Sequence, residues 1–131
     1  MDKPLPRPNA ETRPFWEGCA RSELLYQYCA ACRRAQFYPR SHCAACHGTA
    51  LKWRRSAGRG AVYSCTTVQR APTPAFKAMV PYVIALVDLE EGFRMMLNVL
   101  DCDPAAVKIG TPVRVVFRQE GGATLPQAVP A

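Results

Sequence analysis

The sequence predicts a mainly β protein in which an N-terminal helix and a cysteine-rich metal segment precede a small barrel of five strands. Three observations support this class. Apolar residues repeat at helical spacing near the N-terminus, and two CxxC pairs follow within residues 29–46. From residue 49 onward, short runs of β-branched and aromatic residues alternate with turns that contain Gly or Pro. Five such strands around a long central loop are typical of a closed Greek-key barrel.

Composition and charge limit the classes of protein that fit. With 131 residues, 49% of them hydrophobic, the chain has enough apolar surface for one folded domain. The net charge of +7 favours an anionic partner, which is nucleic acid, a phosphorylated cofactor or an acidic protein surface. We find no apolar run long enough to span a membrane and no secretory h-region, so we expect a cytoplasmic protein with reduced thiols.

The segment that begins at "TRPFWEG" carries the helix signals. Pro14 is tolerated only in a first helical turn, and apolar residues from Trp16 to Leu24 and beyond recur at spacings of three and four. We therefore expect a helix over residues 13–28. Phe15 and Trp16 are either core aromatics of the chain itself or contacts for a partner, and the sequence leaves both interpretations open.

The β segments are expected to pair mainly as hairpins. The runs "ALKWRRS" and "AVYSCTTVQR" flank the turn "AGRG", and "YVIALVDLE" and "FRMMLNVL" flank Glu91-Gly92. "VRVVFRQ" is the expected last strand, "DCDPAAVKIGTP" holds a possible short turn of helix, and "LPQAVP" is an expected tail. The predicted parts are a mobile Pro-rich lead-in (1–12), the helix (13–28), the metal segment (29–48) and the barrel with its tail (49–131).

The strongest motif consists of Cys29-x2-Cys32 and Cys43-x2-Cys46, ten residues apart. Each CxxC turn directs two thiolates at one point, and four thiolates complete a tetrahedral site with no open position. Such a site is structural, with zinc as the expected ion and iron on identical ligands as the alternative. A metal-free cluster whose cysteines are only buried is the remaining interpretation. Arg33 and His47 follow the second cysteine of each pair, where many knuckles have Gly.

Basic residues are frequent in and after the metal segment. They form either a solvated surface or a phosphate-binding edge. With Tyr63, Phe93 and Trp53 as stacking residues, this edge would fit single-stranded nucleic acid, the alternative function that the sequence allows. The aliphatic strands weigh against nucleic acid. The basic residues of this region include Arg33, Arg34, Arg40, Lys52, Arg54, Arg55 and Arg59.

Catalysis by the chain alone is not expected. The sequence contains no GxSxG, P-loop, HExxH or Gly-rich dinucleotide motif, and its only two histidines, His42 and His47, stand beside the predicted metal ligands. Cys19, Cys65 and Cys102 are isolated, and Cys65 is most simply a small buried apolar residue. We therefore predict that this chain contains no catalytic residues.

Taken in order, these motifs resemble the DUF35 family, a rubredoxin-like zinc ribbon fused to an OB-fold. The resemblance rests on "PFWEG", "YCAAC…FYPRSHCAAC", "SAGRGAVYSCTTV", "PYVIALVDLEEGFRMMLNVL" and "VKIGTPVRVVF", and it covers residues 13–130. Ser56, Gly58, Arg59 and Gly60 match the family's characteristic turn, with Ala57 inserted.

The resemblance implies a function as well as a fold. Members are accessory subunits of thiolase-like acyl-CoA enzymes, as in benzylsuccinyl-CoA thiolase and steroid side-chain aldolases. We therefore expect a heterotetramer or similar complex with a thiolase-like catalytic subunit, one structural zinc per chain, and a CoA thioester as shared ligand. The implied zinc ligands are Cys29, Cys32, Cys43 and Cys46, and the implied partner contacts are Phe15, Trp16 and Leu24. Charge and loop position suggest Arg55, Arg59, Arg70 and Lys77 as CoA-binding residues.

Overall fold

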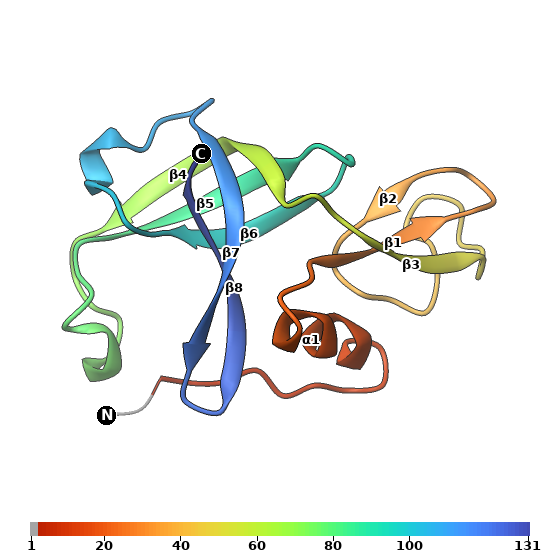
Figure 1. Ribbon diagram of the computed structural model, residues 1–131, viewed down its shortest axis with the longest axis horizontal. Helices are drawn as coiled ribbons and strands as arrows, with labels where there is room; N and C mark the ends of the chain where they lie inside the picture. The colour runs from red at the N-terminus through yellow and green to blue at the C-terminus, as the bar shows by residue number, and fades with distance from the viewer. Residues whose placement is uncertain (1–2) are drawn as a thin grey trace.

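The computed structural model describes residues 3–131 and places one α-helix between a closed barrel and a small three-stranded sheet (Figure 1). This confirms the predicted class of helix, ribbon and five-stranded barrel. No helix in residues 3–131 has the length and apolar character needed to cross a bilayer. The elements are α1 (Arg13–Ala20), β1 (Leu25–Cys29), β2 (Ala35–Gln36), β3 (Leu51–Arg55), β4 (Arg59–Val68), η1 (Pro74–Phe76), β5 (Tyr82–Leu89), β6 (Arg94–Val99), η2 (Pro104–Ala106), β7 (Pro112–Glu120) and β8 (Ala123–Pro130), where η denotes a 3₁₀ turn.

The barrel closes in the order β4-β5-β6-β8-β7, and only β6 and β8 run parallel. Along β5, buried residues alternate with more exposed ones, so one face of the strand lines the core. Val83, Val87 and Val113 are among the largest fully buried side chains. The predicted hairpin around Glu91-Gly92 is confirmed by the pairing of β5 with β6, and the predicted helical turn before β7 is η2.

The helix is shorter than the sequence predicted. It ends at Ala20, and residues expected to continue it form β1. A Schellman motif causes the stop, because Glu23 N–H donates to Gly18 O and Ser22 N–H donates to Cys19 O. Ser22 occupies the left-handed position at φ 59°, where Gly is usual, so no glycine marks the end of the helix in the sequence.

The first predicted hairpin is wrong. β3 pairs with β1 in the ribbon sheet, whose order is β2-β1-β3, and β4 pairs with β5 and β7 in the barrel. Of the turn "AGRG", Ala57 and Gly58 therefore belong to a linker between the two sheets, and Arg59 and Gly60 begin β4.

The predicted C-terminal tail is also wrong, because "LPQAVP" belongs to β8 and supplies the fifth barrel strand. Pro126 pairs with Phe117 of β7, and Pro130 pairs with Val113. Val115 lies between those two partners in the alternation of β7, and its N–H donates to Gly58 O, on the side of β7 that faces β4. Val113 and Phe117 direct their backbone groups to the same side, so the β8 residues opposite them make no ladder hydrogen bond with β7. Proline, which has no N–H, is therefore tolerated at positions 126 and 130.

The lead-in was predicted to be mobile, but residues 3–12 make specific contacts. Lys3 Nζ lies 3.0 Å from a carboxylate oxygen of Glu120. Asn9 Oδ1 accepts from the N–H groups of Glu11 and Thr12 just before α1. The segment runs below β7 and β8 in Figure 1, and residues 1–2 lie outside the described part of the chain.

The β5–β6 hairpin joins the barrel to the ribbon. Ser56 Oγ donates to one carboxylate oxygen of Glu91 at 2.6 Å, and Ala57 N–H donates to the other at 2.8 Å. Beside this contact, the ring of Phe93 stacks on Tyr26 of β1, with centroids 4.7 Å apart. One hairpin of the barrel thus holds both the linker and the ribbon sheet.

We expect Glu91→Ala to lower the free energy of unfolding by about 2–4 kcal/mol, because two hydrogen bonds to a partly buried carboxylate are lost. Chemical denaturation measures the change. Glu90→Ala removes an exposed carboxylate one residue earlier and serves as the matched control. Equal destabilisation by both substitutions would contradict the role assigned to Glu91 in holding the linker.

Candidate functional site

The four cysteines of the two CxxC pairs converge in the ribbon. Their sulfur atoms all lie within 4.8 Å of one another, with Cys29 and Cys46 at 3.7 Å and Cys32 and Cys43 at 3.6 Å. Cys29 ends β1, and Cys32 lies in the turn that follows it. Cys43 and Cys46 come from the loop between β2 and β3. The ribbon sheet therefore brings the two halves of the motif together as the spacing predicted.

The two CxxC turns have nearly the same backbone conformation. Arg33 N–H donates to Cys29 O at 2.8 Å, and His47 N–H donates to Cys43 O at 2.9 Å. Arg33 and His47 adopt left-handed φ values of 62° and 64°. Each therefore takes the conformation that Gly adopts without a steric cost.

The donor set fits a tetrahedral metal. Four metal–sulfur bonds of about 2.3 Å require sulfurs about 3.8 Å apart, close to the two separations above. The N–H groups of Cys46 and Ala45 lower the pKa of Cys43 to about 6, which favours its thiolate. Burial raises the pKa of Cys32 to about 12, so a cation is needed for all four sulfurs to be ionised together. Four thiolates complete the coordination of zinc and leave no position for a substrate.

The other three cysteines lie outside this cluster. Cys19 is fully buried, and burial raises the pKa of its thiol to about 12. Cys65 is half-buried with its sulfur 3.8 Å from Val107 O, and Cys102 packs against the core. These thiols serve packing, as expected for Cys65.

Two of the three predicted partner contacts are part of the chain's own core. Phe15 is 3% exposed and Leu24 is 2% exposed, so neither side chain is available to a partner in this conformation. Phe15 makes edge-on contacts with Trp16 and with Phe37 of the ribbon. Of the predicted set, only Trp16 is partly exposed.

The predicted CoA-binding residues are all exposed, but they do not form one cluster. Arg55 ends β3 and Arg59 begins β4, whereas Arg70 and Lys77 lie in the segment that follows β4. The length of β4 therefore separates the two groups. A single phosphate group is therefore not within reach of all four.

The three aromatic residues proposed as a stacking platform are also dispersed. Phe93 is 4% exposed and belongs to the core. The guanidinium of Arg94 covers Tyr63, 3.5 Å from its ring centroid, and Trp53 packs against the core from β3. This arrangement does not favour the nucleic-acid alternative.

The ribbon surface is strongly cationic. No Asp or Glu occurs between Glu23 and Asp88. Arg54 stacks on Tyr28 with its guanidinium 3.6 Å from the ring centroid, so part of this charge is held in place. The basic residues within the ribbon, all exposed, are Arg33, Arg34, Arg40, Lys52, Arg54 and Arg55.

The turn motif has mainly structural roles. Ser56 accepts from Gly58 N–H while its hydroxyl donates to Glu91, and Gly58 has a left-handed φ of 74°. A Cβ on Gly60 would lie 2.3 Å from Asp88 O, so the close approach of β4 and β5 requires Gly there. Sequence reasoning missed Glu91 as the partner of this turn, because the two lie far apart along the chain.

Comparison with known proteins agrees with this architecture. The family model described as ChsH2, rubredoxin-like zinc ribbon domain, matches residues 16–52, and that described as ChsH2, C-terminal OB-fold domain, matches residues 53–118. A DUF35 domain-containing scaffold protein of Methanothermobacter thermautotrophicus is 36% identical over 76% of this chain and 74% of its own length. This chain is a member of the DUF35 family.

Two further relatives of this DUF35 chain carry functional descriptions. A solved structure described as Ltp2-ChsH2(DUF35) aldolase superposes with a TM-score of 0.85 at 33% identity, covering 96% of this chain and 98% of that chain. A probable enoyl-CoA hydratase alpha subunit of Thermomonospora curvata is 35% identical over 85% of this chain. The match covers 34% of that relative, so this chain spans about a third of its length.

We expect Cys43→Ala to abolish stoichiometric zinc binding and to lower the melting temperature markedly, because a structural metal contributes directly to folding. Metal analysis and thermal denaturation measure the two effects. Cys65→Ser is the matched control, since it removes a thiol outside the cluster. A Cys43→Ala protein that keeps about one zinc per chain would contradict the assigned ligand set.

We expect Arg33→Gly to leave stability nearly unchanged, because release of about 1 kcal/mol of left-handed strain offsets the entropic cost of Gly. Arg34→Gly, one residue later, should cost about 0.5–1 kcal/mol, since no such strain is relieved. Denaturation curves of the two zinc-loaded variants test this. A larger loss at position 33 than at position 34 would refute the knuckle geometry.

Proposed function

We propose that this DUF35 chain is a non-catalytic, zinc-binding subunit of a thiolase-like acyl-CoA enzyme of thiolase or aldolase type. The proposal rests mainly on structural similarity to the Ltp2-ChsH2(DUF35) aldolase, which extends over nearly the whole of the matched chain. The similarity to the hydratase alpha subunit supports acyl-CoA chemistry as the context, since the substrate in that relative's description is an enoyl-CoA. In this proposal the chain stabilises its partner and helps form the acyl-CoA site, in a heterotetramer or similar complex.

The distribution of reactive groups supports a non-catalytic role. Four thiols would hold zinc in a closed site, and Cys19 is buried with a raised pKa. Zinc bound there would stabilise the fold of the ribbon and would perform no chemistry on a substrate. The catalytic nucleophile and base therefore have to come from the partner.

The charge of the ribbon supports an anionic contact. Its basic side chains are exposed, and no acidic residue interrupts them between Glu23 and Asp88. An acidic surface of the catalytic subunit or the phosphates of CoA would complement this charge. Seven free cysteines fit a reducing compartment, and we place the complex in the cytoplasm.

Co-expression with candidate thiolase-like proteins of the same organism tests the proposal. We expect the two chains to co-purify, and we expect cleavage or condensation of an acyl-CoA to require both of them. The Cys43→Ala chain, which is expected to lose zinc, should pair poorly, whereas Cys65→Ser should pair normally. A thiolase-like protein that is fully active and soluble without this chain would overturn the proposed role.

A further inference from the structure

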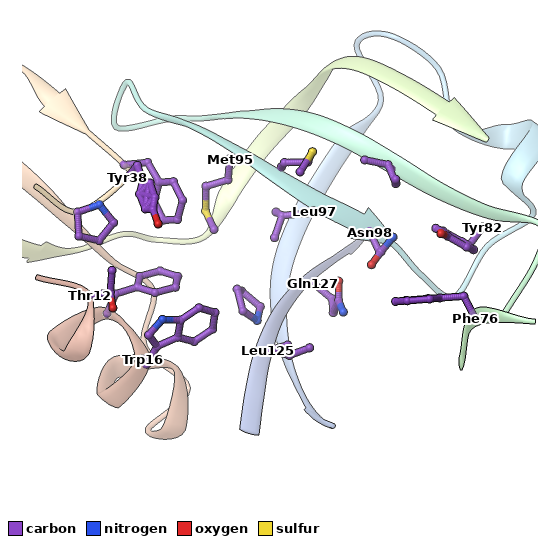
Figure 2. A pocket seen from close by; sticks show the side chains of 16 residues that line it. Thr12, Trp16, Tyr38, Phe76, Tyr82, Met95, Leu97, Asn98, Leu125 and Gln127 are labelled. Carbon is purple, nitrogen blue, oxygen red and sulfur yellow. The ribbon is translucent and has the colours of Figure 1, made fainter. Parts of the chain in front are cut away.

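A groove of about 480 Å³ runs between α1, the ribbon and one face of the barrel. Figure 2 shows Trp16 and Tyr38 at one end of it and Phe76 and Tyr82 at the other. Phe76 belongs to the long loop between β4 and β5, residues 69–81, which we call the β4–β5 loop. The position of this loop therefore determines how far one end of the groove is open.

The β4–β5 loop has few attachments to the rest of the molecule. Outside the strands, its backbone hydrogen bonds all join residues within 73–79, so they hold the loop only to itself. No residue of η1 is buried, and no ion pair among residues 3–131 includes a loop residue. The ring of Phe76 lies 6.0 Å from that of Tyr82, at the start of β5. A loop held so loosely needs a further contact to stay in place.

Residues 3–12, which we call the strap, provide that contact. Lys3 Nζ lies 3.0 Å from Glu120 Oε1 at the end of β7 and 5.8 Å from the centroid of the Phe76 ring. A Cβ on Gly121 would lie 3.3 Å from Leu5 Cδ1, so Leu5 packs on the turn that follows Glu120. One ammonium group thus joins the β4–β5 loop to the end of a barrel strand.

The other end of the strap is fixed at α1. Arg13 N–H donates to Asn9 O at 2.9 Å, and Asn9 N–H donates to Thr12 Oγ1 at 3.0 Å. Thr12 is buried and lines the groove. Prolines at positions 4, 6 and 8 make the part between the two ends extended and stiff. A single stiff segment therefore contacts the groove at α1 through Thr12 and at the Phe76 end through Lys3.

We propose that the strap holds the β4–β5 loop closed, so that release of Lys3 opens the Phe76 end of the groove. The side chains of Lys3 and Glu120 are 24% and 36% exposed, so salt screens their attraction. A cation–π contact at a partly exposed site is similarly weak. The strap therefore opens and closes in the native protein, and salt shifts the equilibrium toward the open form. The inference depends neither on what occupies the groove nor on the proposed function.

Trypsin provides a direct measurement, because Arg70 and Lys77 are exposed residues of the β4–β5 loop. The strap itself resists trypsin, since proline follows each of its basic residues and that of the first helical position, namely Lys3, Arg7 and Arg13. In the zinc-loaded full chain, Lys3→Gln should raise the rate of cleavage after Arg70 and Lys77 about fivefold, because the ion pair and the cation–π contact are lost together. Mass spectrometry of the fragments measures the rate.

A matched substitution tests the position of the contact. Arg7→Gln removes the same charge from an exposed strap residue that has no ion-pair partner among residues 3–131. Its loop should be cleaved at the parent rate, and Lys3→Arg should keep the protection. Cleavage after the exposed Lys108 is the internal reference, since the β6–β7 connection is well separated from the β4–β5 loop in Figure 1. This reference rate should be the same in all four proteins.

Salt provides a second measurement that needs no variant. At about 1 M sodium chloride the Debye length falls to about 3 Å, so loop cleavage relative to Lys108 cleavage should rise in the parent protein. The ratio cancels the effect of salt on trypsin itself, and it should not respond to salt in Lys3→Gln.

Three results would overturn the inference. These are an unchanged ratio in Lys3→Gln, equal ratios in Lys3→Gln and Arg7→Gln, or a parent ratio that does not respond to salt. Each of them leaves the proposed subunit role intact, because co-expression tests that role separately.

Discussion

The β5–β6 hairpin holds the ribbon against the barrel, and the rest of the molecule depends on that contact. Its Glu91 carboxylate accepts two hydrogen bonds from the linker, and Phe93 stacks on Tyr26 of the ribbon sheet. Phe37 extends the aromatic contacts from Phe93 to Phe15 of α1. A polar clamp fixes the position of the linker, while aromatic packing supplies buried area. The helix α1, which contacts both β1 of the ribbon and β8 of the barrel, supports the same arrangement.

The cysteine cluster helps to position one wall of the groove that lies between α1, the ribbon and the barrel. Tyr38 lies in the loop between β2 and Cys43, so the cluster anchors that loop at its far end. Gln27, a buried residue of β1, binds both the N–H and the carbonyl of Arg40, each at 2.9 Å, and anchors the loop next to Tyr38. The cluster thus helps to fix the position of Tyr38, whose side chain lines the groove.

The sequence predicted the parts of this protein that depend on local pattern. The CxxC spacing predicted the cysteine cluster, and the alternation around Glu91-Gly92 predicted a true hairpin. It failed where partners are distant or where a residue takes an unusual role. Ser22 ends the helix in a conformation expected of Gly, and Pro126 lies within a barrel strand because its register needs no N–H there. The strand at "ALKWRRS" was found, but its partner lies before it in the chain and not after it.

The sequence predicted the correct number of barrel strands but assigned one wrong segment to the barrel and left out another. β3 leaves the predicted barrel for the ribbon, and β8 takes its place. β8 supplies Leu125 and Gln127 to the groove wall, so the strand that the sequence analysis treated as a tail completes that wall. β3, by closing the ribbon sheet on β1, brings Arg54 onto Tyr28 and gives the cationic surface its fixed part. The misassigned strands are therefore the ones that place an apolar groove on the barrel and a cationic surface on the ribbon. Both surfaces depend on pairings between segments that lie far apart along the chain, and local sequence pattern carries no signal for such pairings.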